Sequence, residues 1–311
     1  APEVSEWTTR LIELVAKTDK PLMVNWSATH GRHEGERERL EQAGLLCGQY
    51  PGRVTRSVGI FTDFALRKRK FDEGGTGKAE RPVKRAALEL GSGGRPLSEH
   101  ASKQCLAQYG IPATREVLLS LDAVEALTQA PVSFPVAVKL GSPDIPHKTE
   151  ANAVRLGVYS LNELKAAARA VQENGLRHTP GARIEGISIQ EMANGIEVIL
   201  GAVNDPAFGP YVMVGLGGVL TEVLHDVAHR FAPVSDENAR EMIAELKGVK
   251  VLEGYRGAPP ADVDALAQAI VNLSWLILDH RDRVCEVDVN PLFVRPRGEG
   301  VVAADALVVL K

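Results

Sequence analysis

The segment Glu286–Pro291 (Glu-Val-Asp-Val-Asn-Pro) carries polar groups at alternate positions that could bind a metal ion. Glu286, Asp288 and Asn290 alternate with valines, so on a β-strand the three polar side chains share one face. Asp305 follows in a second β-rich run, after a proline and two glycines that permit a chain reversal. Two adjacent strands would then aim carboxylate and amide oxygens at one point, and Mg²⁺ prefers such ligands together with substrate phosphates. For this segment alone, the alternative is an ordinary half-buried hairpin.

A lysine near the end of an otherwise apolar strand, Pro135–Leu140, is a second candidate. An ammonium group is costly to cover unless it meets an anion, and phosphate suits the compact charge of Lys139. The polar loop that follows, residues 141–150, contains two prolines, His147 and Lys148, and is more typical of a catalytic lid than of a connector. His147 could accept a phosphoryl group while Lys148 offsets its charge. The alternatives are a lysine that reaches solvent and an ordinary loop histidine.

Two further segments suggest nucleotide contacts. Gln190–Met192 ends a predicted strand and could act as a hinge whose backbone reads an adenine edge, with Glu191 or Glu197 accepting ribose hydroxyls. A hairpin with a bulged turn is the alternative. Gly215–Gly218 precedes a helical pattern at residues 220–225 and allows amides to approach a phosphate, although it lacks the spacing of the dinucleotide-binding fingerprint.

The elements that must position these groups form two regions. From Leu97 onward, Ser98 caps a predicted helix that ends at Gly110, and a strand near 116–119 and a helix at 121–129 follow. In the first region the expected elements alternate: a helix at 3–17, a strand at 21–26, a helix at 34–43, a strand at 45–48 and a helix at 54–69.

Two strands are too few to cover three helices, so the first region is predicted to be the terminal part of a larger parallel-sheet domain. Its remainder is expected upstream in the natural protein or in another chain. His30 and His33 follow the first strand, where a solvated loop is the favoured interpretation. Residues 67–96, basic at their start and rich in glycine and proline, are predicted to form a solvated, protease-sensitive linker.

Composition sets outer limits on the class of protein. The 311 residues suggest about two domains, and a hydrophobic fraction of 44% is ample for sizeable cores. A net charge of −4 argues against nucleic-acid binding and membrane attachment. Three widely spaced cysteines without a CxxC pair favour reduced thiols over a disulfide framework or a zinc site. The protein is expected to be soluble and cytoplasmic.

Several motifs occur together in one order: Leu97–His100, Ser142–Ile145 with His147-Lys148, Gln190–Met192, Gly215–Gly218, Asp226–Ala228 and Glu286–Pro291. From Leu97 to Leu310 the chain resembles the ATP-grasp domain of the NDP-forming acyl-CoA synthetases, relatives of succinyl-CoA synthetase. Residues 3–70 resemble the end of the flavodoxin-like ligase domain that precedes it in fused members. The resemblance implies an α/β chain: a partial flavodoxin-like parallel-sheet domain at 1–70, a flexible linker at 71–96, and an ATP-grasp fold at 97–311 with two α+β subdomains, 97–187 and 188–311.

The resemblance also implies roles for single residues. Lys139 would contact ATP phosphates, Gln190, Glu191 and Met192 would line the adenine hinge, and Glu197 would lie near ribose or phosphate. Asn290 and Asp305 match the Mg²⁺-binding positions, with Asp288 beside them. His147, next to Lys148, matches a histidine that relays phosphoryl in ADP-forming members. The family reaction joins an organic acid to coenzyme A with ATP, through an acyl phosphate and a phosphohistidine, and yields ADP and phosphate.

Two departures from the family pattern stand out. Glu150 is followed by Ala151 and Asn152 where members commonly have two glycines, and this loss could stiffen the loop. The coenzyme A-binding domain and the domain with the principal phosphohistidine are not in this chain, so they are expected in the same natural chain or in a separate subunit. The chain alone is expected to bind ATP without completing a turnover. The organic acid and the oligomeric state stay open.

Two other functions compete with this reading. A carboxylate–amine ligase of ATP-grasp type would need no phosphohistidine, although the flavodoxin-like remnant argues against it. A non-catalytic nucleotide-sensing module is the third hypothesis, motivated by the altered loop at Ala151 and Asn152.

Overall fold

The computed structural model describes residues 2–27, 33–72, 79–82, 84, 87–88, 90, 94, 96–145, 148–218, 226–255 and 257–311. The chain divides into two compact units, Ala1–Thr76 and Gly77–Lys311. Its helices are α1 (Pro2–Val15), α2 (Glu34–Gln42), α3 (Pro51–Asp72), α4 (Glu99–Gln108), α5 (Leu121–Glu125), α6 (Leu161–His178), α8 (Asp236–Glu245), the 3₁₀ helix η1 (Val249–Val251) and α9 (Val263–Asp279). Its strands are β1 (Met23–Asn25), β2 (Leu46–Gly48), β3 (Glu116–Leu119), β4 (Val136–Gly141), β5 (Val154–Val158), β6 (Gly186–Glu191), β7 (Ile196–Asp205), β8 (Gly209–Leu216), β9 (Val227–Phe231), β10 (Val284–Val294), β11 (Val301–Ala303) and β12 (Leu307–Leu310).

The first unit has the alternating helix and strand order expected from the sequence. Its strands β1 and β2 pair in parallel, with Val24 opposite Cys47. Leu40 and Leu45 are buried, but α3 exposes more than half of Phe61 and Phe64. His33 adopts a left-handed conformation just before α2, whereas His30 lies outside the described residues. The parallel pairing confirms the α/β pattern, and the exposed apolar side chains of α3 fit the expectation that more structure covers this unit.

The segment that was expected to be a flexible linker is partly docked on the second unit. Helix α3 runs on through Asp72, so residues 67–72 are helical. Arg81 donates two hydrogen bonds of 2.7 Å to Asp279, and its guanidinium carbon lies 4.2 Å from the centre of a Trp275 ring. Leu88 and Leu90 are buried in the core. The prediction of a solvated hinge is therefore wrong for these positions, because removing the leucines and the arginine stem from water stabilises the docked state.

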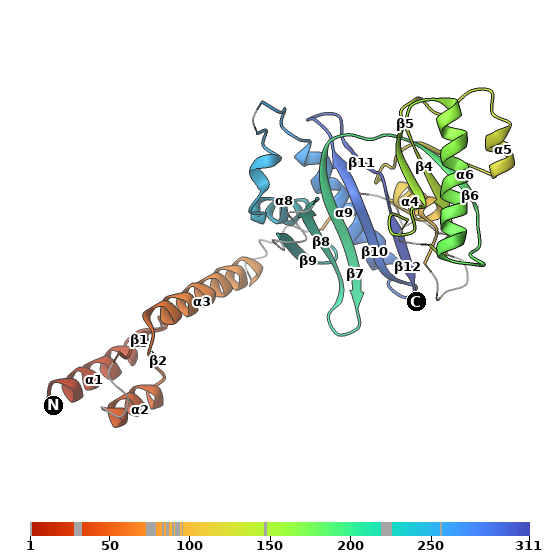
Figure 1. Cartoon of the computed structure of the whole chain (residues 1–311). Helices are drawn as coiled ribbons and strands as arrows, with labels where there is room; N and C mark the ends of the chain where they lie inside the picture. Colours follow the sequence, from red (N-terminus) through yellow and green to blue (C-terminus); the bar gives the residue numbers. More distant parts are fainter. Residues whose placement is uncertain are drawn as a thin grey trace. The chain divides into compact units, whose positions relative to one another are not determined.

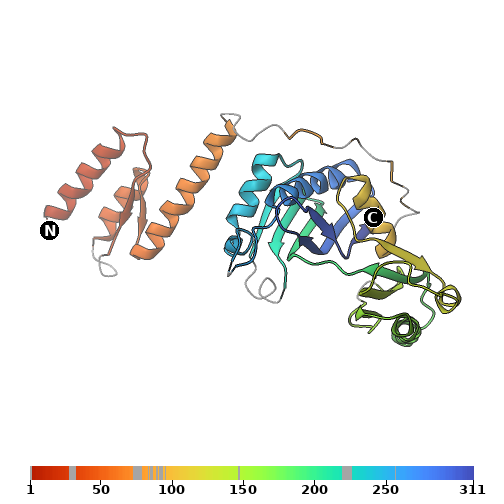
Figure 2. The same ribbon diagram turned by 90° about the horizontal axis from the view of Figure 1, so that it is seen from above.

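The second unit contains two antiparallel sheets that lie side by side (Figures 1 and 2). The small sheet has the strand order β3-β6-β4-β5, and the large sheet has the order β11-β10-β7-β8-β9, with β12 also paired to β10. Helix α6 packs on β4 and β5, and helix α9 packs on β7, β8 and β10 with α8 beside it. Ser98, Ser160 and Asp262 cap α4, α6 and α9 by accepting backbone N–H groups, which fixes where these helices begin.

Strand β10 shows why the large sheet has a polar face and an apolar face. Val287 and Val289 are buried in the core under α9, while Glu286 and Asn290 are exposed on the opposite face. This confirms the predicted alternation. Over the described part of the chain, no helix is both long and apolar enough to cross a membrane.

Candidate active site

A cleft of about 560 Å³ lies between the two sheets of the second unit. It is lined by Lys139, Lys148, Gln190, Glu191, Met192, Glu197, Asp288, Asn290 and Asp305, whereas the glycine-rich segment Gly215–Gly218 does not line it. Of the remaining candidates, His147 lies outside the described residues, and Glu286 does not line the cleft. The topology therefore gathers residues from five separate segments around one cavity.

Lys139 and Gln190 connect the small sheet to the large one. They lie on adjacent strands, where Lys139 is opposite Ser188 and Ala137 is opposite Gln190. The Lys139 ammonium and the Gln190 amide each donate a 3.0 Å hydrogen bond to the backbone carbonyl of Ala304, just after β11. Lys139 is only 6% exposed, so the alternative of a lysine that reaches solvent is wrong, and its contact with a phosphate stays a prediction.

Sequence reasoning missed a buried carboxylate behind the cleft wall, that of Glu99. Its Oε1 accepts hydrogen bonds of 2.6 Å from both Lys103 and Lys139, and its Oε2 lies 3.0 Å from the Lys148 ammonium. Burial alone would raise the pKa of Glu99, but Lys139, Lys103 and Lys148 together hold it well below its usual value. The visible signal was a Glu and a Lys four residues apart after a helix cap, which is typical of a surface pair.

The same network keeps Lys139 charged. Burial would lower the pKa of the Lys139 ammonium, but Glu99 and Asp305 raise it above its usual value. A lysine that stays cationic in a cleft is suited to the phosphates of a nucleotide.

Asp288, Asn290 and Asp305 supply oxygen donors to the opposite wall. Asp288 and Asn290 lie on the same face of β10 and both line the cleft, and the register between β10 and β7 shifts directly after them, between Val289 and Leu292. Asp305 lies between β11 and β12, and its Oδ2 is 3.5 Å from the Lys139 ammonium. Burial raises the pKa of Asp305, while Lys139 opposes the shift.

This donor set fits a hard divalent cation. Carboxylate and amide oxygens are its preferred ligands. The part of the chain that the structure describes contains no group of three or more His, Cys, Asp and Glu residues that could hold a metal ion by themselves. Substrate phosphates would therefore have to complete the coordination shell.

The link between β6 and β7 crosses from one sheet to the other. Strand β6 belongs to the small sheet and β7 to the large one, so the alternative of a bulged hairpin is wrong. The Gln190 side chain accepts from Lys103, and the Glu191 carboxylate accepts from the backbone and the side chain of Arg115. The backbone N–H groups of Glu191 and Met192 are engaged as well, because they donate to the carbonyls of Arg115 and Pro135 at 3.0 and 3.4 Å. The Met192 side chain, which is 41% exposed, lines the cleft, and the adenine contact of Gln190–Met192 stays a prediction.

Glycine 217 packs directly on the backbone of β7. A Cβ atom on Gly217 would lie 2.7 Å from the Cβ of Glu197 and 2.9 Å from its carbonyl carbon. Gly218 has a φ of 85°, and the helix expected at residues 220–225 lies outside the described residues. The structure thus gives Gly217 a packing role, and the predicted phosphate contact of Gly215–Gly218 stays a prediction.

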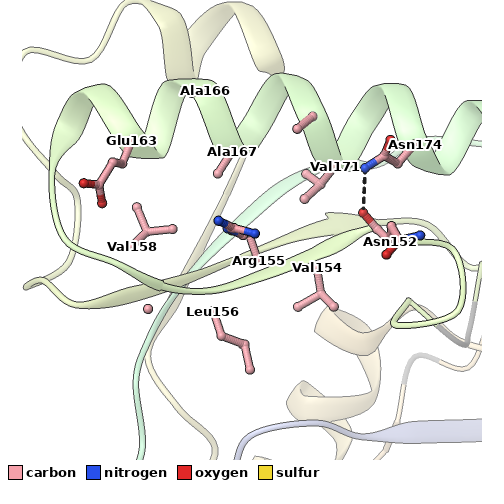
Figure 3. Close-up of a pocket in the computed structure, with 12 residues that line it drawn as sticks. Asn152, Val154, Arg155, Leu156, Val158, Glu163, Ala166, Ala167, Val171 and Asn174 are labelled. Atoms are coloured by element: carbon pink, nitrogen blue, oxygen red, sulfur yellow. Dashed lines mark hydrogen bonds between the residues drawn. The ribbon is translucent and has the colours of Figure 1, made fainter.

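The loop that departs from the family pattern contains an asparagine in a left-handed conformation, and the effect of the two missing glycines on this loop stays a prediction. Asn152 adopts a φ of 50°, a left-handed conformation that glycine would take freely. Its carbonyl accepts a 3.0 Å hydrogen bond from the Asn174 side chain on α6 (Figure 3). Asn152 and Arg155 also line a second cavity of about 510 Å³. Figure 3 shows both side chains at the side of β5 that faces α6. None of the predicted site residues lines this second cavity.

Comparison with known proteins gives consistent matches. The ATP-grasp domain family matches residues 89–310. The beta subunit of acetate–CoA ligase (ADP-forming) II from Pyrococcus furiosus is 42% identical over 225 residues, which cover 71% of this chain and 94% of the subunit. Acetate–CoA ligase (ADP-forming) I from Archaeoglobus fulgidus is 36% identical over 279 residues, which cover 88% of this chain but 40% of that longer protein.

Solved structures agree with these matches. An acetyl-coenzyme A synthetase from Ca. Korarchaeum cryptofilum, in complex with coenzyme A and Ca-AMPCP, is 38% identical with a TM-score of 0.65 and covers 70% of this chain and 94% of its own. The same enzyme with Mg-AMPPCP, 35% identical with a TM-score of 0.58, covers 70% of this chain and 93% of its own. In that complex the phosphohistidine segment points towards the nucleotide-binding site. The predicted ATP-grasp fold is thereby confirmed.

Proposed function

The chain belongs to the ATP-grasp domain family, among the ADP-forming acetate–CoA ligases and their relatives, and we propose that it is the ATP-binding, phosphoryl-transferring part of an acid–thiol ligase. The reaction would be acid + CoA + ATP giving acyl-CoA + ADP + phosphate. The observation that carries this proposal is the cleft between the two sheets, where two lysines face three oxygen-donor side chains.

Lys139 and Lys148 would bind and orient the phosphates on the small-sheet wall. Asp288, Asn290 and Asp305 would hold Mg²⁺ on the other wall, and the ion would neutralise phosphate charge when bound. The base would lie against residues 191–193, with Glu197 accepting ribose hydroxyls. Phosphoryl transfer needs mainly positioning and charge neutralisation, which these groups can supply.

His147 would take the phosphoryl group from ATP. A ring nitrogen would attack the γ-phosphorus, the bond to the bridging oxygen would break, and ADP would leave. The support is that Lys148, the next residue, lines the cleft, and that a related enzyme carries a phosphohistidine segment that reaches its nucleotide site. A carrier histidine separates two chemistries at distant sites.

Coenzyme A and the organic acid would bind mainly to other domains. A longer relative aligns with 88% of this chain over only 40% of its own length, which supports the presence of such domains in a complete enzyme. The first unit would be the end of a flavodoxin-like ligase domain, and its parallel strand pair and the exposed apolar side chains of α3 favour this assignment.

The test is ADP release by the chain together with its coenzyme A-binding partner, measured with and without acid and coenzyme A. We expect release to require both, and Lys139→Ala to lower it at least about a hundredfold, because a charge-assisted phosphate contact acts in the transition state. Lys165→Ala is the matched control, since Lys165 binds the Glu125 carbonyl away from the cleft. Unchanged release in Lys139→Ala would refute the assignment.

His147→Ala separates the remaining hypotheses. A fully active variant would favour a carboxylate–amine ligase, which needs no phosphohistidine. Tight ATP binding without acid-dependent turnover in the complete enzyme would favour a nucleotide-sensing module.

A further inference from the structure

Glu99 stands at the centre of a buried cluster that has two sides. Lys139 and Lys148 line the cleft, whereas Glu99 and Lys103 do not and lie behind its wall. The side chains of all four are at most 8% exposed. A single carboxylate therefore contacts one lysine at the back and two at the front.

The lysine at the back has a complete set of partners. The Lys103 ammonium donates to Glu99 at 2.6 Å, to Glu116 at 3.1 Å and to Gln190 at 2.8 Å. An ammonium has three N–H donors, so Lys103 has none left. It serves to offset the buried carboxylates and to hold Glu99 in place.

The two lysines at the front are held by different oxygens. Lys139 binds Oε1 of Glu99 at 2.6 Å, and Lys148 lies 3.0 Å from Oε2. The contact to Lys148 is an ion pair without hydrogen-bond geometry, because Oε2 has no hydrogen-bond partner. The Lys148 ammonium thus retains donors that can be directed into the cleft.

We propose that Glu99 is a positioning residue that holds Lys139 and Lys148 side by side, so that both ammonium groups meet the phosphates of the bound nucleotide. This inference rests on the proposed function, since it assumes a nucleotide in the cleft. The inference goes beyond the proposed function because it states that one buried side chain, which does not line the cleft, sets the distance between the two lysines.

Two features of the chain show why such a residue is needed. Lys139 is on β4 and Lys148 is in the loop beyond it, so no common element fixes their separation. Two ammonium groups at close range repel each other, and each long side chain must lose rotamer freedom to act. A carboxylate between them removes the repulsion and orders both before the nucleotide arrives.

Glu99 is itself well anchored. It is the first residue of α4, whose start is fixed by the Ser98 cap. Three residues later, the Ser102 hydroxyl accepts a 3.0 Å hydrogen bond from the backbone N–H of Val308 on β12. Helix α4 is therefore tied to the large sheet while its first side chain reaches the lysines of the small-sheet wall.

The experiment compares the affinities of ATP, ADP, AMP and adenosine in the presence of Mg²⁺. For Glu99→Gln we expect ATP and ADP to bind about tenfold or more weakly while adenosine is unchanged, because the lysine contacts to phosphate lose their geometry. Glu99→Asp keeps the charge but is one methylene shorter, so it cannot reach both lysines, and it should show the same selective loss.

Glu116→Gln is the matched control. It removes a buried charge from the same cluster, but Glu116 contacts Lys103, His100 and Ser188 rather than the lysines of the cleft. Its ratio of ATP to adenosine affinity should stay within about threefold of the unmodified protein, as expected for a charge without direct contact. If Glu99→Gln leaves an excess positive charge in the buried cluster and the protein fails to fold, the double variant Glu99→Gln/Lys103→Gln restores the charge balance and should still lack the preference for phosphates.

Three results would overturn the inference: an unchanged ratio of ATP to adenosine affinity in Glu99→Gln, tighter ATP binding in that variant, or an equal loss in Glu116→Gln. Tighter binding would mean that Glu99 competes with phosphate for the lysines. Failure of the proposed function looks different, because the unmodified protein itself would then show no preference for ATP over adenosine.

Discussion

The N–H of Gly217 donates a 2.6 Å hydrogen bond to the carbonyl of Glu197, and the two backbones touch just beyond the end of β8, at a β7 residue that lines the cleft. This contact leaves no room for a side chain at position 217. The position of Glu197 on the cleft wall therefore depends on a glycine that directly follows the neighbouring strand, β8.

Gly217→Ala should destabilise the protein by roughly 1–3 kcal/mol, because an added methyl group must push two backbones apart. It should also weaken ATP binding, since Glu197 moves with β7. Urea unfolding and nucleotide titration measure the two effects. The control is Gly209→Asn, at a turn of the same sheet with open space around it and a φ of 82° that asparagine tolerates. Equal behaviour of the two variants would contradict the prediction.

Asp305→Ala should raise the Mg²⁺ concentration required for half-maximal ATP binding by about tenfold or more, because a charged ligand is lost. Glu286→Gln is the matched control, since Glu286 shares a strand face with Asp288 and Asn290 but lies outside the cleft. Its Mg²⁺ requirement should be unchanged. If Glu286→Gln changed the required Mg²⁺ concentration and Asp305→Ala did not, the metal site would have to lie elsewhere along β10.

Arg81→Ala should expose the chain next to Arg81 to proteases. The change removes the ion pair with Asp279 and the stacking on Trp275 that dock this segment. We expect the rate of limited trypsin cleavage at Lys84 to rise roughly three- to tenfold, in line with the loss of one cation–π contact and one partly exposed ion pair. Equal cleavage rates in both proteins would show that the segment is already undocked in solution.

Asn152→Val should cost about 1–2 kcal/mol of stability, since a β-branched residue does not tolerate the left-handed conformation. Asn152→Gly should keep stability within about 1 kcal/mol, because glycine adopts that conformation freely. Thermal unfolding of both variants provides the comparison. Similar melting temperatures for the valine and glycine variants would show that the backbone at this position relaxes.

Cys105 should react slowly with iodoacetamide and react faster as the pH rises. Burial raises the pKa of the Cys105 thiol to about 11, so the reactive thiolate is scarce at pH 8 and increases about tenfold for each pH unit below that pKa. Peptide mass spectrometry can compare it with Cys285, which is half-buried. Modification of both cysteines at the same rate at pH 8 would be incompatible with the buried environment of Cys105.

Structural features that follow from a regular spacing of side chains along one strand were predictable from the sequence. The alternation along β10 follows from a side-chain period of two residues, so the polar face of Asp288 and Asn290 could be inferred directly. Lys139 could be singled out because a lysine in an apolar strand needs a partner. The order of the motifs then predicted the ATP-grasp fold.

Features that depend on tertiary packing could not be predicted. Glu99 contacts Lys139 across 40 positions of sequence, and its spacing from Lys103 is common on exposed helices. The Asn194-Gly195 pair between two strands is a hairpin signal, yet β6 and β7 belong to different sheets. Leu88 and Leu90 are close in sequence to glycines and charged residues, so no local sequence pattern predicted that these two side chains are buried.

The carbonyl of Ala304 accepts hydrogen bonds from both Lys139 and Gln190 and so joins the two walls of the cleft. Because this acceptor belongs to the main chain, replacing the alanine side chain does not remove it. Substitutions at position 304 should therefore leave the contact between the two walls intact. Substitutions at the two donors, Lys139 and Gln190, should break it. Selection to keep the walls together should consequently fall on positions 139 and 190 rather than on position 304.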